Sequence, residues 1–104
     1  MAETLYQIDL DGVLIRDIDV SSIDTNIVDI TFDGKHIWLT GSGSDKIYQV
    51  DMDGVLIRSI STAGYETTTQ SICFDGKYLW LTGGANDKLY QVDMDGVLIR
   101  SIST

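Results

Sequence analysis

Residues 6–16 read Tyr-Gln-Ile-Asp-Leu-Asp-Gly-Val-Leu-Ile-Arg, and nearly the same run recurs at 48–58 and at 90–100. A second run, Phe-Asp-Gly-Lys-His-Ile-Trp-Leu-Thr-Gly at 32–41, returns at 74–83 with only two replacements. Both runs repeat every 42 residues, so the 104 residues hold about 2.5 copies of one unit. Repetition at this spacing indicates a fold assembled from similar supersecondary units.

Each repeat is predicted to form β-strands rather than helices. The dipeptide Asp-Gly occurs five times, at 11–12, 33–34, 53–54, 75–76 and 95–96. Each pair lies between runs rich in β-branched, aromatic or aliphatic residues, which predicts a β-hairpin with a type I′ turn. One repeat then holds four short strands, which in the second repeat lie near 70–74, 78–82, 88–94 and 97–102.

The predicted strands carry apolar side chains on both faces, so both faces of each sheet must be covered. Four-stranded units of this length, packed face to face around an axis, are typical of the blades of a β-propeller. A stacked linear solenoid is the weaker alternative. We therefore predict an all-β chain whose residues 1–104 form a partial propeller, with a half blade at 5–22 and full blades at about 27–62 and 69–104.

The unit that begins Ile-Thr-Phe-Asp-Gly-Lys-His-Ile-Trp-Leu-Thr at 30–40 and continues Asp-Lys-Ile-Tyr-Gln-Val-Asp-Met-Asp-Gly at 45–54 resembles a propeller blade. The blade is most similar to those of the NHL and YVTN-like group, and it lacks the Gly-His and Trp-Asp signatures of WD repeats. This resemblance implies a fold and not a function, because the same fold serves lectins, scaffolds, lyases and dehydrogenases.

Two full blades are too few to close a ring, because propellers have roughly four to eight blades. An isolated pair would leave an apolar blade face open at each end. We therefore predict a cyclic homo-oligomer: a trimer with six blades, a tetramer with eight, or, as a lower-ranked alternative, a dimer with five. The hairpin at 5–18 nearly duplicates the one at 89–102, so either can complete a blade of a neighbouring chain, and the first is our candidate for the clasp of the ring.

The charge and composition exclude several classes of partner. The chain has 16 acidic and 7 basic residues and a formal net charge of -9, which argues against nucleic acid and anionic membranes as partners. Hydrophobic residues make up 43%, as in ordinary soluble globular proteins. No signal peptide or membrane-spanning run is recognised, so the default expectation is a cytoplasmic protein.

Candidate catalytic and metal-binding residues are few. His36 is the only histidine, and its counterpart in the next repeat is Tyr78, which favours a packing role over that of a general base. Cys73 aligns with Thr31, as expected of a small strand residue. The run at 9–12 and its repeats resemble the start of a calcium loop but lack the glutamate at loop position 12. We therefore predict no catalytic residue, no metal site and no cofactor, and a protein that is not an enzyme.

Two further features bear on ligand binding. Trp38 and Trp80 recur at the same place in a strand, which favours packing between blades over a carbohydrate platform. The repeats differ mainly in the links between hairpins, where ligands usually bind in loop-bearing scaffolds. A small molecule or glycan is expected to contact Ser21, Ser22, Asp24, Asn26, Ser42, Ser44, Tyr65, Glu66, Thr68 and Asn86.

The leading functional hypothesis is a self-assembling propeller that acts as a scaffold or binding module. The alternative is a propeller-type lyase or other enzyme with a site at the central channel. A third possibility is an engineered or recently amplified propeller with no evolved function, because residues 47–62 and 89–104 differ only at Ile47 and Leu89.

Overall fold

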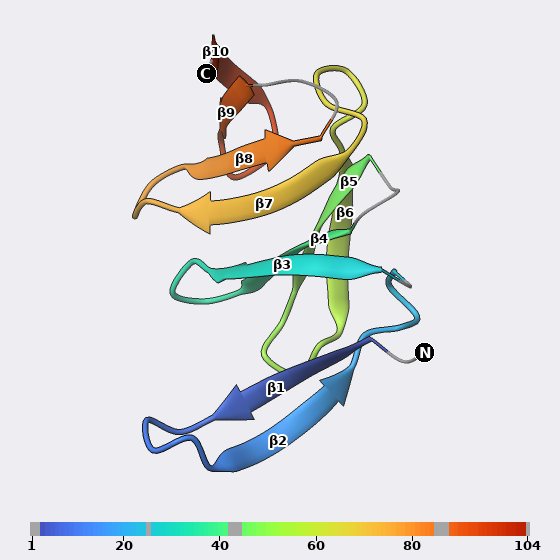
Figure 1. The fold of residues 1–104 in the computed structure, drawn as a ribbon, viewed down its shortest axis with the longest axis vertical. Helices are drawn as coiled ribbons and strands as arrows, with labels where there is room; N and C mark the ends of the chain where they lie inside the picture. Colours follow the sequence, from blue (N-terminus) through green and yellow to red (C-terminus); the bar gives the residue numbers. More distant parts are fainter. Residues whose placement is uncertain (1–2, 25, 42–44, 85–87, 104) are drawn as a thin grey trace.

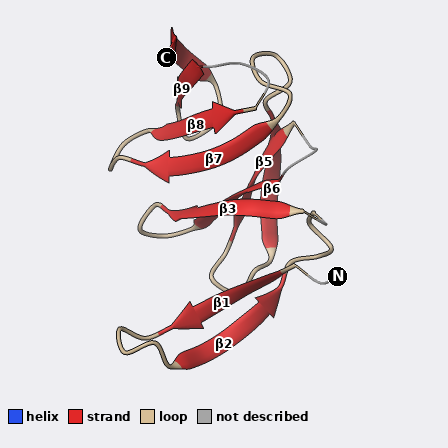
Figure 2. Ribbon diagram, viewed as in Figure 1, coloured by secondary structure: helices blue, strands red, loops and turns tan. Residues whose placement is uncertain are grey.

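The computed structural model describes residues 3–24, 26–41, 45–84 and 88–103. Over these residues the chain forms antiparallel strands and no helix (Figure 1, Figure 2). The strands are β1 (Thr4–Ile8), β2 (Leu14–Asp19), β3 (Ile27–Phe32), β4 (Ile37–Gly41), β5 (Lys46–Val50), β6 (Leu56–Ser61), β7 (Thr69–Phe74), β8 (Leu79–Gly83), β9 (Lys88–Val92) and β10 (Leu98–Ser103). The prediction of an all-β chain built from antiparallel hairpins is confirmed.

The strands form three sheets that follow one another along the long axis of the molecule (Figure 1). The N-terminal hairpin is β1–β2; we call the sheet β3-β4-β5-β6 blade 1 and the sheet β7-β8-β9-β10 blade 2. We call β3–β4 and β7–β8 the inner hairpins, and β1–β2, β5–β6 and β9–β10 the outer hairpins. Blades 1 and 2 meet through β3 and β4 of the first and β7 of the second. The three sheets do not close into a ring over the described residues, and β1–β2 and β9–β10 lie at opposite ends of the view (Figure 1).

The turn of each outer hairpin differs from the predicted type I′ turn. Gly12 has a φ of +84°, but no described residue other than glycine has a positive φ, so Asp11 cannot occupy a type I′ position. The amide of Gly12 donates to the carbonyl of Asp9 at 3.0 Å, and the amide of Asp9 donates to the carbonyl of Val13 at 2.9 Å. This pattern fits a type I turn followed by a glycine bulge. It recurs at 51–55 and 93–97.

The side chain of Asp9 explains why this turn is favoured. Its Oδ1 accepts hydrogen bonds of 2.9 Å from the amides of both Asp11 and Val13. The carboxylate therefore satisfies two backbone donors that the hairpin ladder leaves free.

The inner hairpins use Asp-Gly in another way. Asp33 precedes the turn, Gly34 takes a φ of +96°, and Lys35 keeps a negative φ, which is the sign pattern of a type II′ turn. The Oδ1 of Asp33 accepts from the amides of Lys35 at 2.8 Å and His36 at 2.6 Å. The type I′ prediction is therefore wrong here as well, although the hairpin itself is present.

Two hydrophobic clusters hold the sheets together. The larger cluster spans the joint between blades 1 and 2, and its buried members are Trp38, Ile47, Ile72, Leu79, Leu81, Tyr90 and Val92. The smaller cluster joins the N-terminal hairpin to blade 1 through Val20, Leu39, Tyr48 and Val50. Trp38 is fully buried in the interblade cluster, as expected of a packing residue, whereas its counterpart Trp80 is only partly buried.

Candidate functional site

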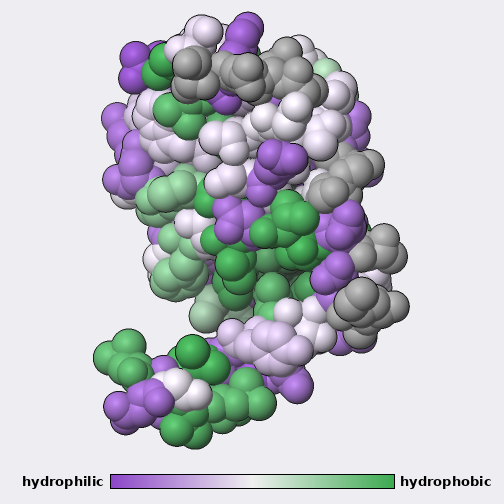
Figure 3. All heavy atoms as spheres, viewed as in Figure 1, coloured by the Kyte–Doolittle hydropathy of each residue, from purple (hydrophilic) through white to green (hydrophobic). Residues whose placement is uncertain are grey.

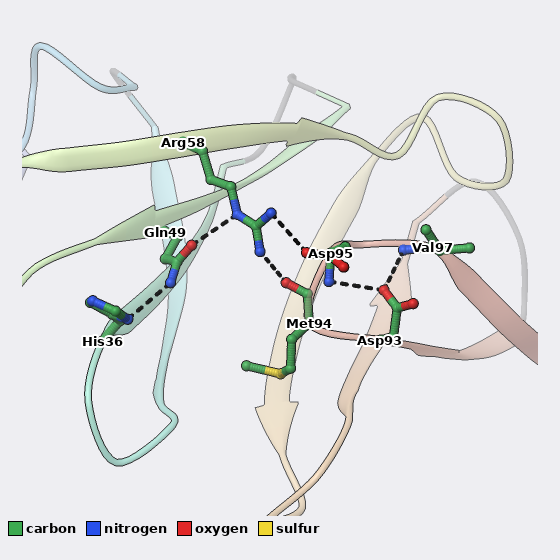
Figure 4. Close-up of polar contacts among 7 residues, drawn as sticks. All are labelled: His36, Gln49, Arg58, Asp93, Met94, Asp95 and Val97. Carbon is green, nitrogen blue, oxygen red and sulfur yellow. Dashed lines mark hydrogen bonds and ion pairs between the residues drawn. The ribbon is translucent and has the colours of Figure 1, made fainter.

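An arginine on the last strand of blade 1 joins that blade to the outer turn of blade 2 (Figure 4). Arg58 Nη1 lies 3.0 Å from Asp95 Oδ1, and Nη2 donates to the carbonyl of Met94. The same guanidinium donates through Nε to Gln49 Oε1 at 2.9 Å and lies over the Trp38 ring, 5.8 Å from its centroid. The joint therefore combines a partly exposed ion pair, a carbonyl contact and a cation–π contact.

Gln49 extends this network to His36. Its Oε1 accepts from Arg58, so its Nε2 faces His36 Nδ1 at 2.9 Å (Figure 4). An amide nitrogen can only donate, so His36 Nδ1 is the acceptor in this contact. His36 thus bonds to a side chain of the same sheet, and its packing role stays a prediction.

The N-terminal hairpin contacts blade 1 as blade 1 contacts blade 2. Arg16 Nη1 lies 2.9 Å from Asp53 Oδ1, and its Nη2 donates to the carbonyl of Met52. A Cβ at Gly54 would collide with Ile18, and a Cβ at Gly96 would collide with Ile60, 42 residues further along. The hairpin therefore occupies the place of the two outer strands of a blade that precedes blade 1. Arg16 and Arg58 thus form the same ion pair 42 residues apart.

Over the described residues β1–β2 is a two-stranded sheet, so no strand pairs with the second edge of β1, and this end of the molecule is exposed. Tyr6 on β1 is 68% exposed, whereas its counterparts Tyr48 and Tyr90 are 6% and 1% exposed. On β3, Ile30 is 48% exposed, whereas its counterpart Ile72 is 4% exposed because β7 lies against blade 1. We call this the N-end face, and it consists of Tyr6, Ile8, Val28, Ile30 and Phe32.

The N-end face borders a cavity of about 230 Å³ between the hairpin and blade 1. Its lining residues are Leu5, Tyr6, Gln7, Arg16, Ile18, Ile30, Thr31, Phe32, Ile37 and Met52. Figure 3 shows hydrophobic side chains on both sides of the hollow above this hairpin. The cavity therefore lies beside β1 and β3, at the open edge of the N-terminal hairpin.

The opposite end of the molecule exposes the far side of blade 2. Arg100 lies over the ring of Trp80 at 5.7 Å and donates to Gln91 Oε1, as Arg58 does with Trp38 and Gln49 in blade 1. No further blade covers it over the described residues. We call this the C-end face, and it consists of Ser71, Cys73, Trp80, Arg100 and Ile102.

The link that enters each blade contains a carboxylate that bonds to a tyrosine, partly buried at Asp24 and fully buried at Glu66. Asp24 Oδ2 accepts from the Tyr48 hydroxyl at 2.9 Å, and Glu66 Oε1 accepts from the Tyr90 hydroxyl at 3.0 Å. A Cβ at Gly83 would collide with the Glu66 carboxyl group, and Gly41 has the same relation to Asp24. These glycines therefore let the carboxylates approach the end of the strand.

Some of the residues proposed for ligand binding face inward. Glu66 is 1% exposed, and its Oε2 accepts from the amide of Thr68 at 3.1 Å. Tyr65 is half-buried, with its ring centroid 5.3 Å from that of Tyr90. Burial, followed by the charge of Asp93 and contact with Tyr90, raises the pKa of Tyr65 to about 12.

Other proposed ligand-binding residues lie nearer to solvent. Ser21 bonds to Asp19 through its amide and hydroxyl, whereas Ser22 and Asn26 are exposed and Thr68 is partly exposed. Ser42, Ser44 and Asn86 lie outside the described residues. Ligand binding at this end of the blades stays a prediction.

The inner turns hold a second kind of carboxylate site. Trp38 Nε1 donates to Asp33 Oδ2 at 2.8 Å, and Trp80 Nε1 donates to Asp75 Oδ2 at 2.7 Å. The pKa of Asp33 is raised by burial, but hydrogen bonds from the His36 amide and Trp38 outweigh this, so the net pKa is lowered. The bond from Trp80, with amide bonds from Tyr78 and Lys77, lowers the pKa of Asp75.

The described part of the chain shows no cluster of three or more His, Cys, Asp or Glu side chains that could hold a metal ion. It also has no helix of the length and apolarity needed to cross a bilayer.

Comparison with known proteins supports the fold. No protein-family model matches the chain, and no curated protein sequence matches it significantly. A Bacteroides caccae protein of unknown function aligns with a TM-score of 0.79 and 13% identity, over 99% of this chain and 39% of its own. Glutaminyl cyclase from Myxococcus xanthus aligns with a TM-score of 0.72 and 16% identity, over 97% of this chain and 42% of its own.

The chain thus spans about two fifths of the length of each of these structures. The prediction that it is not an enzyme is contradicted, because one of the structures that it resembles is an enzyme, although identity this low relates only the folds. The more specific resemblance to NHL and YVTN-like blades stays a prediction. The comparisons and the repeated antiparallel sheets are together consistent with a propeller-like fold.

Proposed function

We propose that this chain is a self-assembling propeller module, in which several copies close a ring. The main support is the unequal burial of equivalent residues: Tyr6 is exposed, whereas Tyr48 and Tyr90 are buried. Fully burying an apolar side chain contributes about 1.5–3 kcal/mol, so covering the N-end face is strongly favourable.

Rings of three or four chains, with six or eight blades, are the assemblies that we favour. Such a ring brings the links that enter the blades to one end, where the side chains of Ser22 and Asn26 are exposed. We propose that this end binds a small molecule or a glycan. A glycan array and a small-molecule screen by thermal shift that both stay blank would remove this part of the proposal.

The assembly is tested by measuring the native mass of the purified 104-residue chain by light scattering over a range of concentrations. Three or four chain masses are expected, and two would favour the five-blade ring. A monomer at all concentrations overturns the proposal.

A pair of variants separates the N-end face from general surface effects. Phe32→Asp places a charge on the N-end face and should dissociate the ring. Val55→Asp is the matched control, because Val13, Val55 and Val97 are each 60% exposed and so are unaffected by neighbouring blades. Equal loss of assembly in both variants would argue against the N-end face.

A further inference from the structure

We infer that the β7–β8 part of the C-end face of one copy docks on the N-end face of the next, where β7 and β8 take the place beside β1. The hairpin β9–β10 of the first copy and the N-terminal hairpin of the second then compete for one position, because both correspond to β5–β6 of blade 1. This inference rests on the proposed self-assembly and names the surfaces and the register of the joint. The occupant of the N-end face is therefore a second copy of this chain.

The internal joint between blades 1 and 2 supplies the template. There, the side of β3–β4 that carries Asp29 and Trp38 meets the side of β7 that carries Ile72. Asp29 Oδ2 accepts a hydrogen bond of 2.8 Å from the amide of Ile72, which fixes the register of the joint.

The joint between copies follows from the 42-residue repeat: 42 is added to the residue numbers on the β3–β4 side of the template and subtracted from those on the β7 side. Ser71 replaces Asp29 on the C-end face, and Ile30 replaces Ile72 on the N-end face. The template therefore places Ser71 of one copy beside the amide of Ile30 of the next. Ile72 is 4% exposed in the template, and Ile30 would be covered in the same way.

Among the described residues, β7–β8 is the inner hairpin whose side equivalent to that of Asp29 and Trp38 is not covered by another sheet. The equivalent side of β3–β4 is covered by blade 2, and Trp38 is fully buried there. On β7–β8, by contrast, Ser71 and Cys73 are exposed and Trp80 is partly exposed. A second copy must therefore approach with β7–β8.

The position of the N-terminal hairpin and the unpaired edge of β1 also favour docking through β7–β8. The N-terminal hairpin is already held by Arg16 at the spacing that Arg58 sets between blades 1 and 2. The second edge of β1 pairs with no strand over the described residues, whereas the same edge of β5 pairs with β4. An inner hairpin thus fits between β1 and the axis of the ring.

Cysteine cross-linking tests the register, because the chain has a single cysteine, Cys73, and it lies in the C-end face. The register that places Ser71 beside Ile30 places Cys73 beside Phe32, two residues further along both strands. In Phe32→Cys, mild oxidation should therefore join Cys73 of one copy to the new thiol of the next and give a ladder of covalent multimers. A disulfide requires the two Cα atoms to lie within roughly 7 Å, so it reports close approach. Phe32→Cys combined with Cys73→Ser should lose the ladder.

Val55→Cys with native Cys73 is the matched control, because residue 55 lies in an outer turn. A ladder in Phe32→Cys that exceeds the one in Val55→Cys supports the inference. Native mass is measured on the same samples. A closed oligomer without the Phe32→Cys ladder overturns this docking register and leaves the proposed self-assembly standing, whereas a monomer overturns both.

Discussion

The hydroxyl of Tyr90 donates a hydrogen bond of 3.0 Å to the buried carboxylate of Glu66. The donor lies on the third strand of blade 2, and the acceptor lies in the link that enters the same blade. The contact therefore ties the connection between blades to the interior of the following sheet. A buried carboxylate is costly without such donors, so this bond should contribute to stability.

Tyr90→Phe should lower the free energy of unfolding by about 1–3 kcal/mol, because it leaves the Glu66 carboxylate buried with one donor fewer. Denaturant unfolding followed by tryptophan fluorescence measures the change. Tyr78→Phe is the control, since the Tyr78 hydroxyl makes no hydrogen bond within the described part of the chain. Its ring contacts the Lys77 ammonium group, and this contact does not need the hydroxyl. Equal losses in the two variants would show that the Glu66 contact is not the cause.

Arg58→Ala should cost more stability than Asp95→Asn. The ion pair is partly exposed, so removing the Asp95 charge should cost less than about 1 kcal/mol. Removing Arg58 also takes away the donor to the Met94 carbonyl and the cover over Trp38, which should raise the loss to about 1–3 kcal/mol. Denaturant midpoints of both variants compare the two, and a larger loss in Asp95→Asn would contradict the ranking.

The hydrogen bond from Trp80 makes Asp75 a source of acid sensitivity. Its pKa is lowered from the ordinary value of 3.8, so the folded state holds the charged form more strongly than the unfolded state. The resulting stability is present above the unfolded pKa and is lost as pH falls through the lower, folded value. Asp75→Asn should thus be less stable than the parent at neutral pH, and the gap should narrow in acid. A gap that stays constant with pH in denaturant titrations would contradict this.

Ser71→Asp should strengthen assembly, because it places on the C-end face the carboxylate that Asp29 uses in the internal joint. A charged hydrogen bond of about 1.5 kcal/mol would lower the dissociation concentration roughly tenfold. Light scattering over a dilution series measures the concentration at which the oligomer dissociates. Ser101→Asp adds the same charge at an exposed position on β10 outside the C-end face, and it should not strengthen assembly. No gain in Ser71→Asp over Ser101→Asp would argue against the inferred register.

The strands could be predicted from sequence because apolar runs and Asp-Gly pairs recur at a fixed spacing. The turn types could not, because Asp-Gly is compatible with several hairpin turns. The choice depends on what else the carboxylates bond: Asp9 accepts from two amides in the outer turn, and Asp33 also accepts from Trp38. Those bonds depend on the folded geometry of the hairpin, which the sequence does not show.

The paired carboxylates in the links were also missed. Residues 19–27 and 61–69 share only Thr25 and Thr67, so the alignment suggested variable loops that contact a ligand. Asp24 and Glu66 nevertheless keep the same chemical group at the same position, and their acceptor role depends on tyrosines 24 residues later. A comparison by chemical type rather than by identity would have found this signal.

In the proposed assembly, the contact between Arg16 and Asp53 sets the sequence of the steps. Arg100 of an arriving copy would dock where Asp53 already holds Arg16, so the outer position is occupied when the inner strands meet. Encounter of the inner strands is bimolecular and depends on concentration. The choice between the N-terminal hairpin of one copy and β9–β10 of the other then becomes a unimolecular strand displacement. Its rate should be independent of protein concentration, so ring closure should show two relaxation phases.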